Sequence, residues 1–334
     1  MTTEEVMARL GKKTRDRVQL ASEIKIERIP WASVGLTAQT GGLARGRTHL
    51  LYGPKSAGKS LLSMETVGQQ QDNGLVSAII DSEGTTDPTF ITKLGVDPTQ
   101  LIVTHDKSFL EAGKNVTEFL KAGVDILVID SISTLVPDEF MDEEELKASD
   151  GQRQIGAFSK ACKKLFRTIH YNNENTVVIV VSQVTMALGA MHASMTFEGG
   201  KAVEHGSSQI IRMTASAAEA QQLKGLTTIN DTIIERPIGR EVSLFIEKNK
   251  LGLASGTTKY DMYYGGDNVG IDKIKELVTL GTEFGVVRKA GAWVYYGEMQ
   301  FNGAKKMSEA LREDEKLFNE VRDKIIEASG VRTD

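Results

Sequence analysis

The chain has 334 residues, of which 40% are hydrophobic and 25% are charged, and its formal net charge is −5 at pH 7. This composition is typical of a soluble globular protein that is long enough for one large domain and a smaller one. No apolar run approaches the roughly 20 residues of a transmembrane helix. The single cysteine, Cys162, excludes an intrachain disulfide and a zinc cluster. We therefore expect a cytoplasmic protein with no membrane contact, on which any DNA-binding surface is a local basic patch.

The N-terminal residues 1–28 are highly charged and predict a short helical arm. The arm's basic positions are Arg9, Lys12, Lys13, Arg15 and Arg17. Residues 29–265 then alternate apolar runs with helical patterns, which predicts an α/β fold with a mainly parallel sheet covered by helices. The apolar runs are THLLYG (48–53), VSAIID (76–81), ILVID (126–130), VVIVVS (177–182), IIRMT (210–214) and EVSLFIE (241–247).

The pattern changes near residue 266 and becomes mainly helical. In the last segment, EDEKLFNEVRDKIIEAS, Leu317, Val321 and Ile325 repeat at helical spacing. We expect residues 266–334 to form a small C-terminal α+β domain, separate from the sheet-containing core.

Residues 53–60 have the sequence GPKSAGKS, between an apolar strand and a helical pattern, which is the context of a phosphate-binding P-loop. Glycines let successive backbone N–H groups curve around phosphate oxygens, and the helix N-terminus adds its positive dipole. Lys59 then reaches the β- and γ-phosphates and the Ser60 hydroxyl ligates Mg²⁺, so ATP and Mg²⁺ are the expected cofactors. The predicted nucleotide-binding residues are Gly53, Pro54, Lys55, Ser56, Ala57, Gly58, Lys59 and Ser60.

Three other predicted strands end in polar residues that suit the same site. Asp130 ends ILVID, where it would orient the Mg²⁺ shell; Glu83 follows VSAIID and Gln183 follows VVIVVS. Because ligands bind at the carboxyl ends of parallel strands, we expect these side chains to meet the P-loop. Glu83 would then activate water for attack on the γ-phosphate, and Gln183 would donate a hydrogen bond to that phosphate. A polar strand terminus without function is the alternative for each residue alone.

Several segments of the chain, in order, resemble the RecA recombinase family. They are GGLARGRTHLLYGPKSAGKS (41–60), IIDSEGTTDPTFITKLGVD (79–97), ILVIDSISTLVP (126–137), Ser182-Gln183 with Gly199-Gly200, EKNK (247–250), MYYGG (262–266) and KAGAWVYYGE (289–298). The resemblance covers roughly residues 29–328, and its last three segments are much more specific than a P-loop alone.

The resemblance implies a P-loop NTPase core of the RecA type at residues 29–265. It also implies a helical filament that forms on single-stranded DNA, pairs it with homologous double-stranded DNA and exchanges strands under the control of ATP hydrolysis. The arm at 1–28 would contact the neighbouring subunit. The family's long acidic C-terminal tail has no counterpart after Ser329, which predicts a weaker Mg²⁺ dependence of duplex uptake.

The resemblance also assigns residues outside the P-loop to the nucleotide. Asp87 and Phe90 would lie at the adenine, with Phe90 in place of the family's usual tyrosine, and Tyr264 would approach the adenine from the neighbouring subunit. Lys248 and Lys250 would reach the neighbour's ATP and neutralise charge on the transferred phosphoryl group. Solvated lysines at a strand end are the alternative.

Residues 184–200 match the family's second DNA-binding loop. Leu188 falls where the family inserts an aliphatic side chain between base triplets, and Gly199 and Gly200 would offer backbone N–H groups to phosphates. The family's basic residues early in this loop are replaced here by Thr185 and Ala187. A buried loop that packs on its own domain is the alternative.

The first DNA-binding loop of the family corresponds to residues 137–151, which carry seven acidic residues here and so are unlike a phosphate-binding surface. Positive charge for DNA must then come from the following helical segment. Its predicted core stripe is Ile155, Phe158, Cys162, Leu165 and Ile169. Its predicted DNA-binding residues, on another face, are Arg153, Lys160 and Lys163. A merely solvated basic face is the alternative.

Two other functions are compatible with part of the pattern. A RecA-like ring ATPase or helicase would share the P-loop, Glu83 and Asp130, but is not expected to carry the KAGAW segment at 289–293. A non-catalytic DNA-binding filament protein would tolerate the loss of Glu83, which is present.

Overall fold

The computed structural model describes residues 1–15, 18–141, 151–186, 195–215, 222–229, 232–252, 255–266 and 268–331. The strands of its large sheet are β3 (Thr48–Gly53), β4 (Ser77–Asp81), β5 (Leu101–Thr104), β6 (Ile126–Asp130), β7 (Val177–Met186), β8 (Met195–Phe197), β9 (Gln209–Ala215), β10 (Gln222–Ile229), β11 (Thr232–Asn249), β12 (Gly256–Tyr263) and β13 (Gly270–Ile271). The helices next to it are α3 (Val34–Thr40), α4 (Lys59–Gln71), α5 (Pro88–Lys93), α6 (Phe109–Ala122), α8 (Gly151–Asn172) and α9 (Gly200–Gly206), with short turns η2 (Ile132–Thr134) and η3 (Asp138–Phe140).

The sheet is mainly parallel, as the sequence predicts. Its order is β13-β12-β11-β9-β3-β7-β6-β4-β5, with β10 paired to β11 and β8 to β7. The strands from β9 to β5 in this order run parallel to one another, whereas β11 and β12 add an antiparallel edge. All six predicted apolar runs are strands, so the predicted α/β class is confirmed.

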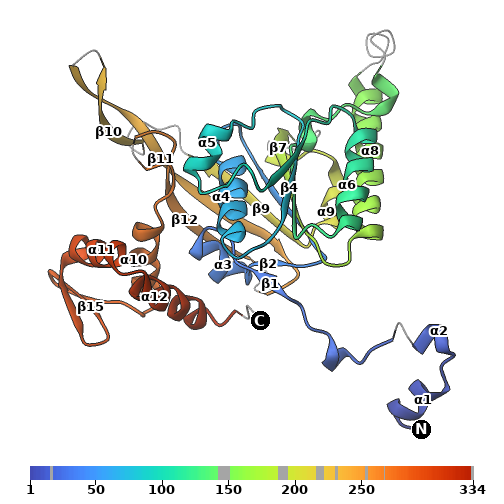
Figure 1. The fold of residues 1–334 in the computed structure, drawn as a ribbon, viewed down its shortest axis with the longest axis horizontal. Coiled ribbons are helices and arrows are strands. Elements are labelled where there is room, and N and C mark those ends of the chain that lie inside the picture. The colour runs from blue at the N-terminus through green and yellow to red at the C-terminus, as the bar shows by residue number, and fades with distance from the viewer. Residues whose placement is uncertain are drawn as a thin grey trace.

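Alternation along the buried strands places one apolar layer on each face of the sheet. Leu51 and Ile79 belong to the core cluster that contains the apolar residues of α4 and α5. Their chain neighbours Leu50 and Ile80 point the other way, into the cluster of α6, α8 and α9. These two layers follow from the two-residue period of a strand. Figure 1 shows α4 and α5 on one side of the sheet and α6 and α8 on the other.

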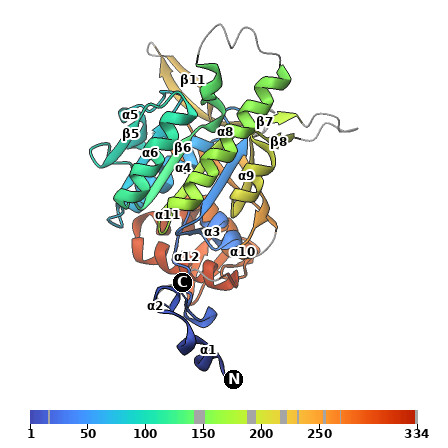
Figure 2. The same ribbon diagram turned by 90° about the vertical axis from the view of Figure 1, so that its right-hand side faces the viewer.

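Helix α8 corrects part of the predicted core stripe. Cys162, Leu165 and Ile169 are buried and Phe158 is half-buried, as predicted, but Ile155 is 54% exposed. Ile155 was predicted to be a core residue, but it is exposed like every other residue from 151 to 156, so this prediction is wrong. The first turns of α8 extend beyond the sheet that covers the rest of the helix, as Figure 2 shows.

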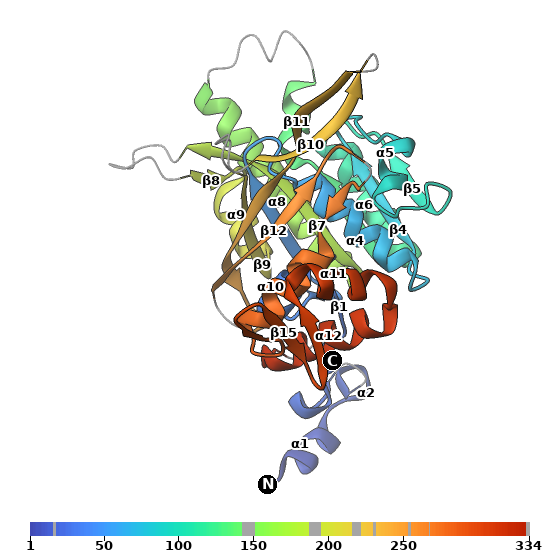
Figure 3. The ribbon, with the colours of Figure 1, turned by 90° about the vertical axis from the view of Figure 1, so that its left-hand side faces the viewer.

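The long hairpin of β10 and β11 was not predicted beyond residues 241–247. β11 continues the predicted run back to Thr232, and β10 pairs with it antiparallel from Gln222↔Arg240 to Ile229↔Thr232. Figures 1 and 3 show this hairpin projecting from the body of the sheet.

The C-terminal part contains the predicted mixture of helices and strands. It comprises α10 (Lys273–Glu283), β14 (Arg288–Ala290), β15 (Trp293–Tyr296), β16 (Met299–Asn302), α11 (Gly303–Glu313) and α12 (Glu315–Ala328), with β14-β15-β16 as an antiparallel sheet. The predicted stripe of Leu317, Val321 and Ile325 is buried. The same cluster includes Val34 and Ala38 of α3. Helix α3, which precedes residue 265 by far in the chain, therefore contributes to the hydrophobic core of the C-terminal part. The boundary at residue 265 stays a prediction.

The N-terminal arm consists of α1 (Thr3–Arg9), α2 (Lys12–Arg15) and the turn η1 (Ala21–Glu23), and it reaches the body through β1 (Arg28–Ile29), which pairs with β2 (Leu43–Ala44). No residue of α1 is buried, and Val6 and Ile24 are 45% and 53% exposed. Figures 1 and 2 show the arm extending away from the body.

A buried carboxylate joins the C-terminal helices to the core. Glu276 of α10 accepts hydrogen bonds from the Ser33 hydroxyl (2.5 Å), the Val34 N–H (3.1 Å) and the Gly35 N–H (3.0 Å) at the start of α3. Burial raises the pKa of Glu276 to about 7. The three hydrogen bonds act in the opposite direction and lower the pKa, whereas the nearby Glu65 carboxylate raises it further.

We predict that ionisation of Glu276 lowers the free energy of unfolding as the pH rises. Its pKa is higher in the folded protein than in the unfolded chain, so folding retains a proton between about pH 4.5 and 7. The free energy of unfolding of the wild type should decrease over that window relative to Glu276→Gln, by on the order of 2–3 kcal/mol. Urea unfolding at a series of pH values checks this. Glu283→Gln, at an exposed position of the same helix, is the control; equal pH dependence of all three proteins would contradict the prediction.

Candidate functional site

The predicted P-loop forms the turn between β3 and α4. Gly58 has φ +91°, a conformation that favours glycine, and Ser56 has φ +59°. A Cβ atom at Gly53 would lie 2.1 Å from the Met213 carbonyl oxygen, and one at Gly58 would lie 2.4 Å from the Met262 sulfur. A Cβ at Gly53 would thus collide with backbone, whereas a Cβ at Gly58 would strain a positive φ and displace the end of the Met262 side chain.

The Lys59 ammonium group binds two backbone carbonyl oxygens of the P-loop. Its Nζ donates hydrogen bonds to the carbonyl oxygens of Gly53 (2.9 Å) and Pro54 (2.8 Å). Burial lowers the pKa of Lys59, while the charges of Asp130 and Glu83 act in the opposite direction. The ammonium group thus lies where it can turn from backbone carbonyls to a phosphate.

A cavity of about 560 Å³ opens beside the P-loop. This is large enough for a nucleotide-sized ligand. The predicted residues that line it are Lys55, Ser56, Lys59, Ser60, Glu83, Asp130 and Gln183. Strand register explains this convergence, because Gly53 lies level with Gln183 and Asp81 lies level with Asp130 in parallel pairs.

The sequence patterns did not predict the other residues that line this cavity. They are Ser82, Thr85, Ser131, Thr134 and Val181. The polar run DSIST after β6 was the signal that could have found Ser131 and Thr134, since short hydroxyl side chains there face the same edge. Ser82 Oγ accepts the Ser131 N–H (2.8 Å), which ties the ends of β4 and β6 together.

The oxygen donors at the base of the cavity suit a divalent cation. Burial raises the pKa of Asp130 to about 6; the hydrogen bond from Ser60 opposes this shift, and the carboxylates of Glu83 and Asp81 reinforce it. A carboxylate and an adjacent hydroxyl are hard oxygen ligands of the kind Mg²⁺ binds together with phosphates. The donor set of Ser60 and Asp130 therefore fits Mg²⁺.

Glu83 and Gln183 both line the cavity. The Ser131 hydroxyl donates to Glu83 Oε1 (3.3 Å), and the Glu83 side chain is exposed. The Gln183 N–H donates to Ser133 Oγ (2.8 Å), which fixes the backbone while the side chain faces the cavity. Glu83 thus offers an exposed carboxylate to the cavity.

Three residues expected at the adenine lie outside the lining of this cavity. Asp87 caps α5 by accepting the Thr89 N–H (2.8 Å). Phe90 is 36% exposed and Tyr264 is 38% exposed, with the Arg240 guanidinium 5.2 Å from the centre of the Tyr264 ring. Both rings are accessible for stacking, and their contact with adenine stays a prediction.

Lys248 and Lys250 also lie away from the cavity. Lys248 Nζ donates to the Glu204 carbonyl oxygen in α9, and burial followed by the charge of Lys250 lowers the pKa of Lys248. Lys250 is exposed. Neither side chain is among those that line the cavity of its own subunit.

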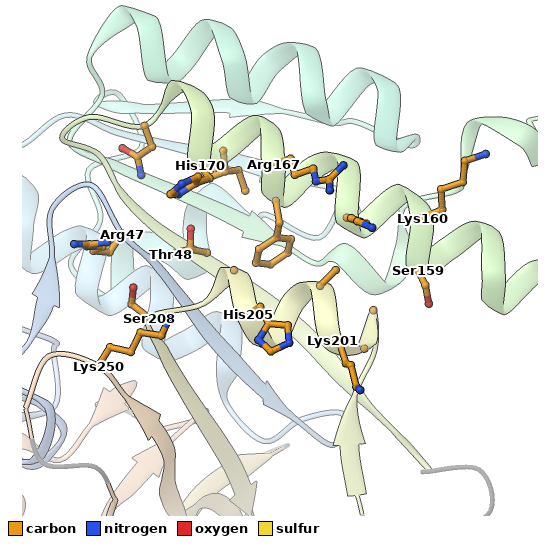
Figure 4. A pocket seen from close by; sticks show the side chains of 18 of the residues that line it. Arg47, Thr48, Ser159, Lys160, Arg167, His170, Lys201, His205, Ser208 and Lys250 are labelled. Carbon is orange, nitrogen blue, oxygen red and sulfur yellow. The ribbon is translucent and has the colours of Figure 1, made fainter. Parts of the chain in front are cut away.

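A second hollow of about 780 Å³ lies between α8 and α9, and we call it the α8–α9 groove (Figure 4). Of the predicted DNA-binding residues, Lys160, Lys163, Gly199 and Gly200 line it. Arg153 does not; its guanidinium lies 6.0 Å from the centre of the Phe140 ring. Leu188 falls outside the described residues.

This fold and cavity define a P-loop nucleotide-binding protein. The family model described as "RecA N-terminal domain" matches residues 1–269, and the one described as "RecA C-terminal domain" matches residues 275–330. The chain belongs to the RecA family. No helix in the described part of the chain is long and apolar enough to cross a bilayer.

Curated relatives agree along most of the chain. "Protein RecA" of Chlorobaculum tepidum is 34% identical over 292 residues, which cover 85% of this chain and 78% of the relative. "Protein RecA" of Thermus aquaticus is 31% identical over 326 residues (95% and 90%), and that of Methylobacterium radiotolerans is 31% identical over 328 residues (97% and 84%).

We predict that Gly58→Ala destabilises the protein and impairs nucleotide binding. The positive φ costs about 1–2 kcal/mol for a residue with a Cβ, and the new atom would also meet the Met262 sulfur. Gly74→Ala, where φ is +77° and no heavy atom lies within 4 Å of the new Cβ, is the control. Thermal unfolding should show loss of stability in both variants, whereas a nucleotide titration should weaken only for Gly58→Ala. Wild-type nucleotide affinity in Gly58→Ala would contradict the assignment.

Proposed function

We propose that this protein is an ATP-dependent homologous recombination protein. It forms helical filaments on single-stranded DNA, pairs that strand with homologous double-stranded DNA, and exchanges strands with DNA-dependent ATP hydrolysis. The observation that carries the proposal is the cavity in which Lys59, Ser60, Glu83, Asp130 and Gln183 converge, in a chain of the RecA family.

The cavity supports ATP hydrolysis by the P-loop scheme. Backbone N–H groups of residues 55–58 cradle the phosphates, and Lys59 exchanges its carbonyl partners for phosphate oxygens. Ser60 and Asp130 would hold Mg²⁺, which would supply positive charge next to the phosphates. Glu83 accepts the proton of the attacking water, and Gln183 senses the γ-phosphate.

Assembly completes the nucleotide site. Asp87 and Phe90 approach the adenine within one subunit, and Tyr264 approaches it from the next. Lys248 and Lys250 neutralise the neighbour's γ-phosphate, which agrees with their position outside their own cavity. The projecting arm at 1–28 contacts the adjacent subunit, where the exposed side chains of Val6 and Ile24 can be covered.

DNA binds at the second loop and the neighbouring groove. Gly199 and Gly200 offer backbone N–H groups, Lys160, Lys163 and Arg153 neutralise phosphates, and Leu188 inserts between bases. Of the acidic residues in the described part of the first loop, Asp138 accepts the Leu110 N–H (2.9 Å) and Glu139 forms an exposed ion pair with Lys160 (2.7 Å). Such exposed pairs are worth about 0–1 kcal/mol, so phosphate can replace the carboxylate.

We predict that Glu83→Ala binds ATP but turns it over 10²–10⁴-fold more slowly, which is roughly the contribution of a general base. The side chain is exposed, so its removal should leave folding and the P-loop intact. Nucleotide titration and DNA-stimulated phosphate release measure the two effects. Glu174→Ala, an exposed carboxylate elsewhere, is the control. A turnover rate near that of the wild type would exclude Glu83 as the base.

We predict that Lys250→Ala subunits and Lys59→Ala subunits, each inactive alone, regain ATP turnover when mixed. At some junctions an intact Lys250 then meets an intact P-loop, and a cationic finger supplied in trans contributes roughly 10³–10⁵ in rate. Phosphate release is measured on assemblies shown to contain both variants. Absence of recovery in such assemblies would refute the action in trans.

Electron microscopy of the wild type with single-stranded DNA and a slowly hydrolysed ATP analogue tests the proposal as a whole. A helical filament supports it. A closed ring would favour the ring ATPase or helicase, and a filament without ATP turnover would favour the non-catalytic alternative.

A further inference from the structure

The alternation of buried and outward residues along β11 breaks near the two lysines assigned to the neighbour's nucleotide. Every second residue from Val242 to Ile246 is buried, so an unbroken strand would also turn Lys248 and Lys250 towards the core. The structure shows the opposite phase, because Asn249 is buried and Lys250 is exposed. The strand therefore changes phase before Asn249.

A β-bulge produces this change. In the antiparallel pair with β9, Ile246 lies opposite Ile211. The next paired residue of β11 is Lys248, which lies opposite Ile210, so Glu247 is an extra residue on β11. One extra residue shifts the two-residue period of a strand by one position. The inward and outward positions that follow the bulge are thereby exchanged.

The exchange places both lysines on the face of the sheet that α9 covers. Lys248 Nζ donates to the Glu204 carbonyl oxygen in α9, and Lys250 lines the α8–α9 groove. Without the extra residue, the two charges would lie on the face that contains the apolar layer of Ile246. Because burial of unpaired charge is costly, the bulge is what allows two lysines to follow this buried strand.

Asn249 holds the new phase from the core side. Its Nδ2 donates to the Thr40 carbonyl oxygen in α3 (3.2 Å), and its Oδ1 accepts from Gln209 Nε2 (3.3 Å) and the Leu251 N–H (3.0 Å). Gln209 is fully buried and also donates to the Gly42 carbonyl oxygen (2.9 Å). These contacts use the donor and the acceptor of the Asn249 amide, which explains an asparagine between the two lysines.

Glu247 holds the bulge from the opposite face. Its Oε1 accepts from Arg212 Nε of β9 (2.7 Å), and its Oε2 accepts from the Tyr52 hydroxyl of β3 (2.6 Å). β9 and β3 are the next two strands of the sheet after β11. The Arg212 guanidinium also lies 4.2 Å from the centre of the Phe245 ring. The extra residue is thus fixed by side chains on both sides of the sheet.

Fixing this segment matters because it carries two like charges at the end of a strand. Burial, and then the charge of Lys250, lower the pKa of Lys248. β11 ends at Asn249, and the Lys250 N–H donates to the Ser208 carbonyl oxygen (3.0 Å), with the Lys250 side chain beside Ser208 in Figure 4. A cation that acts on another subunit needs a defined position, since a misplacement of about 1 Å can cost about 10²-fold in rate.

We propose that the bulge at residue 247 positions Lys248 and Lys250 against the nucleotide of the neighbouring subunit. Glu247, Asn249 and Gln209 are its positioning residues, and they act through the two lysines. The inference rests on the proposed function for the role of these lysines. Its own claim is that the hydrogen bonds of Glu247 and Asn249 determine where the lysines lie.

ATP turnover of assemblies on single-stranded DNA tests the core-side contacts. Asn249→Ala removes both hydrogen-bonding groups of the amide and should lower turnover by about 10²-fold. Nucleotide titration of the DNA-free protein should be unchanged, because the P-loop of the same subunit is intact. Gln71→Ala is the matched control and should keep wild-type turnover. It removes a buried amide that donates to the Asp97 carbonyl oxygen (3.3 Å) and accepts the Asp97 N–H (2.9 Å).

Variants of Glu247 test the other face at an exposed position. Glu247→Ala should lower turnover in the same assay, and Glu247→Gln, which keeps one acceptor oxygen, should recover part of the loss. Glu241→Ala is the control on the same strand. It removes an ion pair with Lys259 (3.1 Å) from the regular part of β11 and should keep wild-type turnover.

Combined variants show whether Asn249 acts through the lysines. Adding Asn249→Ala to Lys248→Ala with Lys250→Ala should lower turnover no further, because residues that act through one another are not additive. Mixed with Lys59→Ala subunits, Asn249→Ala subunits should regain turnover. Their own P-loops are intact and would receive correctly placed lysines from the Lys59→Ala subunits.

Each outcome leads to a distinct conclusion. Wild-type turnover in either Asn249→Ala or Glu247→Ala, with Lys250→Ala inactive, would overturn the inference and leave the proposed function intact. A further loss in the combined variant, or no recovery in mixed assemblies, would overturn it in favour of a role in folding alone. Wild-type turnover in Lys250→Ala would overturn the action in trans, and the inference with it. If Asn249→Ala does not fold, the Glu247 variants decide.

Discussion

The parallel register of β3, β7, β6 and β4 is the constraint on which the candidate site depends. Each of these strands is buried on both faces, so a slip of one residue would exchange the apolar layers against α4 and α6. The register that buries both layers is also the one that sets Gly53 level with Gln183 and Asp81 level with Asp130. Core packing thereby determines the positions of side chains that contribute nothing to the core.

The electrostatics of the cavity follow from this convergence. Burial lowers the pKa of Lys59 and raises that of Asp130 to about 6, so each group's charge is disfavoured by its surroundings. The attraction between the Lys59 ammonium group and the Asp130 carboxylate offsets only part of the free-energy cost of burying the two charges. A phosphate next to the lysine and a cation next to the carboxylate would both favour the charged forms. The site is thus organised to bind opposite charges together, as a metal–nucleotide complex presents them.

Strand β7 links the two candidate sites. It contributes Gln183 to the cavity, and three residues of its end pair antiparallel with β8, from Val184↔Phe197 to Met186↔Met195. The chain then passes directly from β8 to Gly199 at the edge of the α8–α9 groove. A displacement of Gln183 along the strand would therefore be transmitted through hydrogen-bonded backbone to the α8–α9 groove, which under the proposed function gives the nucleotide a physical route to influence DNA binding.

The sequence by itself determined the features that arise from local patterns. The apolar runs predicted the central strands, the glycines of residues 53–60 predicted the phosphate loop, and the polar strand ends identified Glu83, Asp130 and Gln183. These signals are local, because strand burial and backbone curvature impose periods and residue types on adjacent positions.

Tertiary structure alone decided what depends on neighbours distant in sequence. Ile155 fits the helical stripe but is exposed, because the sheet ends before the first turns of α8 do. Helix α3 lies in the core segment yet packs with the C-terminal helices. Arg47 and Lys201 carry no motif, and they join Arg167 only because β3 and α9 are folded against α8. Which residues of different elements come together depends on how the elements pack. The periodicity of residues within one element cannot predict it.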